Sequence, residues 1–139
     1  MSANPVLAFG SSSAARPDRL LQVLLRLART PRLSVLAYHR VLPAHDPLFP
    51  GEPSAAEFEQ RMRWVQANFD VLALGEAVRA LREHRLPRRA LSITFDDGYA
   101  DNYTVALPIL RRLGLPATFF VATGFLDGGC MFNLSLIHI

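Results

Sequence analysis

Short apolar runs rich in strand-forming residues alternate along this chain with stretches whose apolar residues recur at helical spacing. The runs cover residues 33–38, 90–95 and 117–122, with a brief extended piece at 70–72. Each run is short enough for a buried strand, and the segments between them have the 3.6-residue period of amphipathic helices. This alternation predicts an α/β protein with a parallel sheet, in which functional groups gather at the carboxyl ends of the strands.

A helix is expected to begin at Ser54, which forms a capping box with Glu57. Its apolar face repeats at helical spacing and consists of Phe58, Met62, Val65 and Phe69. A second helix is predicted to end near Arg85, and its apolar face consists of Leu74, Val78 and Leu81. The following arginines, Arg85, Arg88 and Arg89, are interpreted as a polar connection into the next buried strand.

A further helical stripe follows the strand at 90–95. It consists of Val105, Ile109 and Leu113 and is closed by Gly114. Pro108 falls inside the stripe, and proline removes a backbone donor from a helix interior. This helix is therefore expected to be kinked or to start late.

The chain divides into three predicted parts. Residues 1–32 form an extension with a leucine-rich helix between Pro17 and Pro31, interpreted as a docking helix rather than a membrane-surface anchor. Residues 33–133 form part of one α/β domain. Residues 134–139 read LSLIHI, which matches a translated transposon-end sequencing adapter, so we expect a non-native tail; a genuine short strand is the alternative.

Composition excludes several classes of protein. Half of the 139 residues are hydrophobic, enough to bury one core. The net charge of +3 comes from scattered arginines, so no nucleic-acid partner is expected. Cys130 is the single cysteine, which excludes a disulfide scaffold. No apolar run reaches membrane-spanning length and no signal peptide is evident, so the default location is the cytoplasm, with action at the cell envelope left open.

The chemistry concentrates in the segment LSITFDDGYADN. An apolar strand delivers Asp96 and Asp97 to its carboxyl end, and Gly98 allows a tight turn. Adjacent carboxylates repel each other unless a cation or a shared proton relieves the repulsion. One can ligate a divalent metal while its neighbour takes a proton from bound water. The alternative is a surface Asp-Asp-Gly turn, which is less common directly after a buried strand.

The stretch ALSITFDDGYADNYTVALPILRRLGLPATFFVATGFLD resembles the first motif and the following helix and strand of the polysaccharide deacetylases, the fourth carbohydrate-esterase family. The resemblance extends back through LSVLAYHRV and covers residues 33–133. It implies an incomplete, distorted β/α barrel and a hydrolase that removes N-acetyl groups from an amino-sugar polysaccharide.

The resemblance also implies roles for individual residues. Asp96 takes the place of the general base and Asp97 that of a metal ligand, usually to zinc. The early Tyr38-His39 pair is similar to that of the poly-N-acetylglucosamine deacetylases, which makes His39 the candidate acid for the departing amine. A histidine that is hydrogen-bonded at a strand end is the alternative interpretation of His39.

The chain also departs from the family pattern. The later His-x-x-x-His motif is absent, and His45, His84 and His138 do not have that spacing. His45 and His84 are interpreted as surface residues. Tyr99 and Asp101 lie beside the motif and could line the site, although a helix cap suffices for Asp101.

Other classes fit less well. A receiver domain needs a lysine, and the chain has none. A haloacid-dehalogenase-type phosphatase needs Asp-x-Asp, whereas Asp96 and Asp97 are adjacent. The remaining rival is a deacetylase-like module that binds a glycan or a partner without turnover.

Overall fold

The computed structural model describes residues 19–20, 23 and 32–125. Its strands are β1 (Ser34–Tyr38), β2 (Asp70–Val71), β3 (Ala90–Phe95) and β4 (Thr118–Phe119). Its helices are α2 (Ala55–Asn68), α3 (Leu74–Arg82) and α4 (Leu107–Leu113), with a π-helical segment η1 (Asn102–Ala106) and a 3-10 turn η2 (Thr123–Phe125). Apart from residues 19–20 and 23, which are helical, the predicted leucine-rich helix lies outside the described residues, as does the predicted tail at 134–139.

Strand β3 is the centre of a parallel sheet. β1 pairs with it along its whole length on one side. On the other side β2 pairs with Ala90 and Leu91, and β4 pairs with Thr94 and Phe95. The α/β class with a parallel sheet is therefore confirmed, while the described strands form an open sheet and show no closed barrel.

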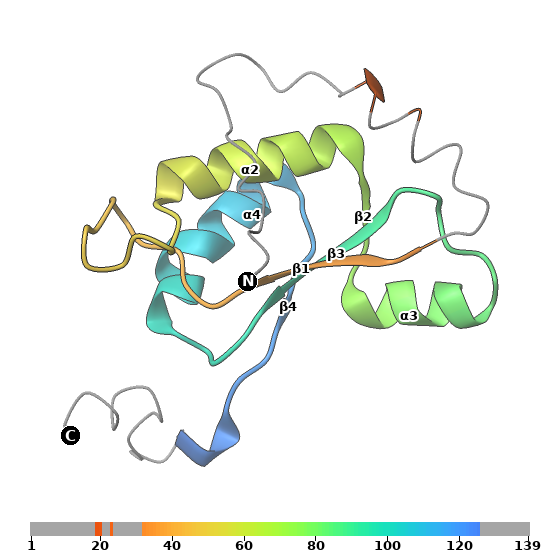
Figure 1. The fold of residues 1–139 in the computed structure, drawn as a ribbon. Coiled ribbons are helices and arrows are strands. Elements are labelled where there is room, and N and C mark those ends of the chain that lie inside the picture. Colours follow the sequence, from red (N-terminus) through yellow and green to blue (C-terminus); the bar gives the residue numbers. More distant parts are fainter. Residues whose placement is uncertain (1–18, 21–22, 24–31, 126–139) are drawn as a thin grey trace, which may run out of the picture.

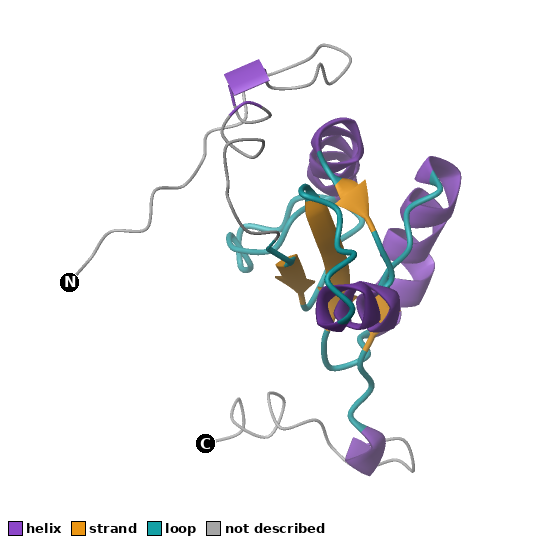
Figure 2. Cartoon of the chain, turned by 90° about the vertical axis from the view of Figure 1, so that its right-hand side faces the viewer, coloured by secondary structure: helices purple, strands orange, loops and turns teal. Residues whose placement is uncertain are grey.

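The side chains of β3 alternate between two layers. Leu91, Ile93 and Phe95 join the main core, which also contains buried side chains of α2 and α4. Ala90 belongs to a smaller cluster with Ala77 of α3. Helices thus cover both faces of the sheet: α2 and α4 lie together above it and α3 below it in Figure 1, and Figure 2 shows the strands between helices.

Helix α2 begins where the sequence predicts it. The Ser54 N–H donates to the Glu57 carboxylate over 2.8 Å, and the Glu57 N–H donates to the Ser54 hydroxyl over 3.4 Å. This reciprocal pair satisfies two backbone donors at the helix start. Phe58, Met62 and Val65 are buried as expected, so this face anchors α2 on the sheet.

The helix after β3 does start late. Residues 102–106 are π-helical, and the Leu107 N–H donates to the Asn102 carbonyl five positions back. Pro108 lies in the first turn of α4, where a missing N–H costs least. Gly114 ends the helix with φ at 65°, in the left-handed conformation that favours glycine at this position. Ile109 and Leu113 are buried.

Two expectations about burial were wrong. The run at 33–38 forms β1, but its residues are exposed or half-buried because β1 has β3 as its single neighbour among the described strands. In α3 the buried residue is Ala77, whereas Leu81 remains 41% exposed. The small Ala77 allows α3 to lie close to the sheet.

The described helices lack the features of a membrane span. None of those within residues 19–20, 23 and 32–125 combines the length and apolar character that crossing a bilayer requires.

Candidate active site

Three strands end level with one another at one edge of the sheet. The register pairs Tyr38 with Phe95 and Phe95 with Phe119. Hydrogen bonds continue beyond these strand ends: the Asp96 N–H donates to the Tyr38 carbonyl over 2.9 Å, and the Phe120 N–H donates to the Phe95 carbonyl over 2.7 Å. The residues that follow these strands therefore meet at the carboxyl edge, where open parallel sheets bind ligands.

The turn after β3 has an unusual backbone. Asp97 and Gly98 both adopt left-handed conformations, with φ at 70° and 71°. Aspartate is one of the few residues other than glycine that tolerates this region. Glycine at 98 is needed for a second reason, because a Cβ atom there would lie 3.1 Å from Cγ1 of Val121. The Asp-Asp-Gly sequence thus suits a tight and crowded turn.

The predicted site residues come to this edge together. Asp96 and Asp97 are both half-buried, so neither carboxylate is sealed from solvent. His39 is exposed and follows β1 directly, as Asp96 follows β3 in the paired register. The fold brings these residues to one edge, and their roles as acid, base and metal ligand stay predictions.

The described donors do not make up a metal site. Within residues 19–20, 23 and 32–125, no group of three or more His, Cys, Asp or Glu side chains could hold a metal ion. A catalytic zinc takes about three ligands from the protein. The described residues therefore do not fit a complete zinc site.

The structure describes two further histidines. His45 and His84 are exposed, which confirms their interpretation as surface residues. His138 lies outside the described residues.

Arg40 is a residue that the sequence did not indicate. Its Nε atom donates to Asp101 Oδ2 over 2.8 Å, and its guanidinium carbon lies 4.9 Å from the ring centre of Tyr99 and 5.5 Å from that of Phe49. The Val41 N–H donates to the other carboxylate oxygen of Asp101 over 3.3 Å. We call Arg40, Asp101, Tyr99 and Phe49 the Arg40 cluster.

The cluster corrects one interpretation of Asp101. Its side chain makes no capping hydrogen bond to η1, because both carboxylate oxygens are used by Arg40 and Val41. Asp101 therefore links two loops at the carboxyl edge instead of capping a helix. No local pattern reveals this pair, because Arg40 and Asp101 are 61 positions apart.

Tyr38 has a different environment from its neighbour His39. Its ring lies 5.2 Å from that of Phe58 and 5.6 Å from that of Phe95. Burial raises the pKa of the Tyr38 hydroxyl, and the Arg61 guanidinium partly opposes this shift. Tyr38 is therefore half-buried against the core, whereas His39 is exposed.

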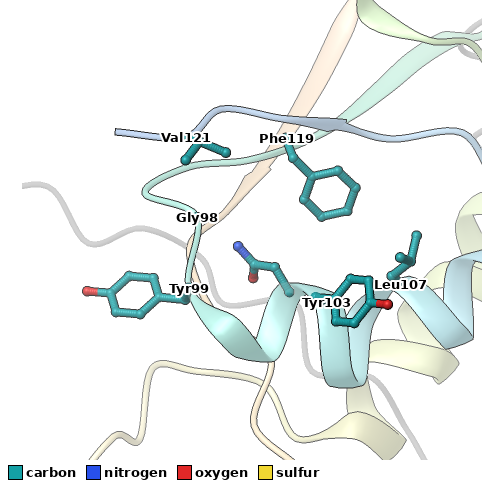
Figure 3. A pocket seen from close by; sticks show the side chains of 7 residues that line it. Gly98, Tyr99, Tyr103, Leu107, Phe119 and Val121 are labelled. Carbon is teal, nitrogen blue, oxygen red and sulfur yellow. The ribbon is translucent and has the colours of Figure 1, made fainter. Parts of the chain in front are cut away.

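A cavity of about 200 Å³ lies beside the Asp97–Gly98 turn. Figure 3 shows Phe119 and Val121 on one side and Tyr103 and Leu107 on the other. Phe119 stacks on Phe95 with 4.9 Å between ring centres, which places the cavity on the sheet face that α2 and α4 cover.

Asn102 also lines this cavity, and its side chain is buried. Neither its Nδ2 nor its Oδ1 atom has a hydrogen-bond partner within the described part of the chain. Buried amides are normally paired, with protein or with ordered water. The cavity offers room for such a partner.

The family comparison matches residues 83–129 to the family described as polysaccharide deacetylase. This segment contains β3, the Asp96–Asp97 turn, α4 and β4. YxkH of Bacillus subtilis, whose name provisionally assigns it to the polysaccharide deacetylases, is 33% identical over 99 residues, 70% of this chain and 34% of that protein.

A second relative is the poly-beta-1,6-N-acetyl-D-glucosamine N-deacetylase of Staphylococcus aureus, which is 32% identical over 60% of this chain and 29% of its own length. Among solved structures, the de-N-acetylase of Aggregatibacter actinomycetemcomitans superposes with a TM-score of 0.62 at 32% identity, over 70% of this chain and 40% of that one. The chain thus spans about a third of the length of the curated relatives it matches.

Proposed function

Since this chain belongs to the polysaccharide deacetylase family, we propose that the complete protein is a hydrolase that removes N-acetyl groups from an amino-sugar polymer. The observation that carries this proposal is the position of Asp96 and Asp97 on a tight turn at the carboxyl edge of β3, within the segment that matches the family. The half-buried carboxylates meet the needs of acid-base chemistry because they stay accessible.

We propose that Asp96 is the general base and Asp97 a ligand of a divalent cation, zinc above all. When bound, such a cation polarises the amide carbonyl and the attacking water. Asp97 would be one ligand among several, since the described donors do not complete a site. The other ligands would come from residues outside the described part.

His39 is proposed as the acid that protonates the departing amine. Its support is the paired register of β1 and β3, which brings the residue after Tyr38 beside the residue after Phe95. The exposed side chain of His39 is accessible to a substrate, as this role requires. Tyr38 has no part in this proposal because its ring packs against the core, between Phe58 and Phe95.

A closed, distorted β/α barrel is proposed for the complete domain. Support comes from the edge of β1 that pairs with no other described strand, where Val35 is 49% exposed. Additional strands that pair with this edge would cover such apolar side chains and remove unpaired backbone groups.

The substrate class proposed is a polymer of N-acetylglucosamine. The Staphylococcus aureus relative is named for a β-1,6-linked polymer of this sugar. That name supports N-acetylglucosamine as the sugar of the proposed substrate. Comparing β-1,4- and β-1,6-linked oligomers as substrates would identify the linkage that the complete protein accepts.

The test uses the complete protein with two substitutions in the turn. We expect Asp96→Asn to abolish acetate release while zinc affinity is retained, and Asp97→Ala to weaken zinc binding and abolish acetate release. Asp70→Asn is the matched control, since Asp70 pairs beside Ala90 at the opposite end of β3. Near-normal turnover by Asp96→Asn would refute the base assignment. Glycan binding without acetate release by the wild type would favour a binding module without turnover.

A further inference from the structure

Arg40 connects segments that are far apart in the sequence. It follows His39 directly, and its guanidinium reaches Asp101, which lies four residues beyond Asp97. The same group lies over the Tyr99 ring, next to Gly98, and over Phe49 of the long loop between β1 and α2. A single side chain thus ties the loop that carries His39 to the turn that carries the paired aspartates.

The pair between Arg40 and Asp101 is partly buried, with side-chain exposures of 29% and 11%. Both nitrogens Nε and Nη2 of Arg40 lie 2.8 Å from Oδ2 of Asp101. Charge-assisted hydrogen bonds of this kind add geometric specificity as well as energy. The Val41 N–H, on the other carboxylate oxygen, fixes the orientation of the carboxylate.

Overall stability is a poor explanation for such a pair. Moving charges out of water costs free energy that mutual attraction often only balances, and apolar replacements can be neutral. The pairs on the helix surfaces differ, because Arg63 and Glu59 are four positions apart on α2 and Arg63 is 53% exposed. What the Arg40 cluster supplies is a defined spacing between two loops.

We propose that Arg40 and Asp101 form a clamp that holds His39 and the Asp96–Asp97 turn at a fixed separation, and that both are positioning residues for amide hydrolysis. This inference rests on the proposed function, because an acid and a base must act on opposite sides of the same acetamide. A displacement of about 1 Å in such a site can cost on the order of 100-fold in rate.

A backbone hydrogen bond beside the clamp also connects the ends of β1 and β3. The Asp96 N–H bond to the Tyr38 carbonyl holds the backbones of β3 and β1 together. It ends at Asp96, and beyond that residue the clamp acts together with the close packing of Gly98 against Val121. Lysine should not replace Arg40, since it lacks the planar fork and stacks less well on the Tyr99 ring.

The test compares variants of the complete protein on an N-acetylglucosamine oligomer and on an activated acetate ester. Arg40→Met and Asp101→Asn should each lower kcat on the amide by roughly 10- to 100-fold, with KM changed by less than about threefold. The ester should be affected less, because its leaving group needs no proton from His39. The double variant should be no slower than the slower single variant, because both remove one clamp.

Two further variants separate positioning from folding. Arg63→Met removes an exposed arginine from an ion pair on α2 and should leave kcat within about twofold of the wild type. Arg40→Lys keeps the charge and should recover little of the lost rate. Three results would each overturn the clamp. The loss of kcat in a variant could equal the fraction of that variant that is unfolded, or the losses of the two single variants could multiply in the double variant. Arg40→Lys could also retain the full activity of the wild type.

Hydrogen exchange distinguishes failure of the clamp from failure of the proposed function. If the wild type releases no acetate, the proposed deacetylase function is refuted. The clamp is then tested by the hydrogen-exchange rates of backbone amides alone. The Val41 amide should exchange at least about tenfold faster in Asp101→Asn than in the wild type, because its acceptor is weakened. Unchanged exchange in that variant would refute the clamp, whatever the activity.

Discussion

Replacing Gly98 with alanine should destabilise the protein for two reasons, the left-handed backbone at this position and the lack of space for a Cβ atom. Gly98 has φ at 71° and little free space, since a Cβ atom would lie 3.1 Å from Cγ1 and 3.5 Å from Cα of Val121. Gly114 has φ at 65° and Gly75 an ordinary φ, and a Cβ atom added at either glycine would meet nothing within 4 Å. The three glycines thus form a matched series.

The expected magnitudes follow from these differences. Alanine at Gly75, the second residue of α3, should stabilise the protein by at most about 0.5–1 kcal/mol through helix propensity. Alanine at Gly114 should cost roughly 1–2 kcal/mol from the left-handed backbone alone. Alanine at Gly98 adds crowding against a β-branched side chain, worth about 1–3 kcal/mol more, for a total near 2–5 kcal/mol.

Urea unfolding of each variant measures the free energy of unfolding from the midpoint and slope. Val121→Ala combined with Gly98→Ala should recover most of the crowding cost, because the contacted atoms Cγ1 and Cγ2 are removed. The reasoning is refuted if Gly98→Ala costs no more than Gly114→Ala, or if Val121→Ala fails to relieve it.

Other predictions follow from the site and the core. His39→Ala should slow amide hydrolysis more than hydrolysis of an activated ester, and equal losses in kcat/KM would argue for a structural histidine. Ser54→Ala should cost roughly 0.5–2 kcal/mol in urea unfolding through loss of the α2 cap. Hydrogen bonds from Ser54 lower the pKa of Glu57. The stabilisation from these bonds is therefore present above the unfolded-state pKa of Glu57 and fades as pH falls through its folded-state pKa. If the cost of Ser54→Ala did not change with pH in acid, this explanation would be contradicted. Burial raises the pKa of Tyr38. The contribution of Tyr38 to the free energy of unfolding is therefore present below its ordinary pKa of 10.0 and is lost as pH rises through the folded-state pKa. Ultraviolet titration should show that Tyr38 ionises above its ordinary pKa, and Tyr38→Phe should reduce the loss of stability at alkaline pH.

Features with a local cause could be predicted from the sequence. β3 has the predicted bounds at residues 90–95 because a continuous apolar run suits a strand buried on both faces. The start of α2 was predictable because Ser54 and Glu57 bond within one helical turn. Pro108 likewise forced a late α4 through its missing N–H.

Features that depend on distant partners could not be predicted. The exposure of β1 depends on how many strands pair with it, which its own residues do not encode. The link between Arg40 and Asp101 needs the register of β1 on β3 before the two residues meet. The Asp-Asp-Gly turn lies at the carboxyl end of β3, as the sequence predicts, whereas the contact between Arg40 and Asp101 beside that turn was visible only in three dimensions.

On one side β3 pairs with β2 at its amino-terminal end and with β4 at its carboxyl end. This arrangement has a consequence while the ribosome synthesises the chain. The ribosome releases the amino-terminal residues first, so β1 and β2 are already available when β3 emerges. β4 follows only after residues 96–117, and until then the carboxyl half of β3 has β1 alone as its partner. A pause in translation within this interval would leave the ring of Phe95 stacked on Tyr38 but without Phe119. Nascent chains halted there would present an apolar strand end to chaperones, directly beside the aspartates.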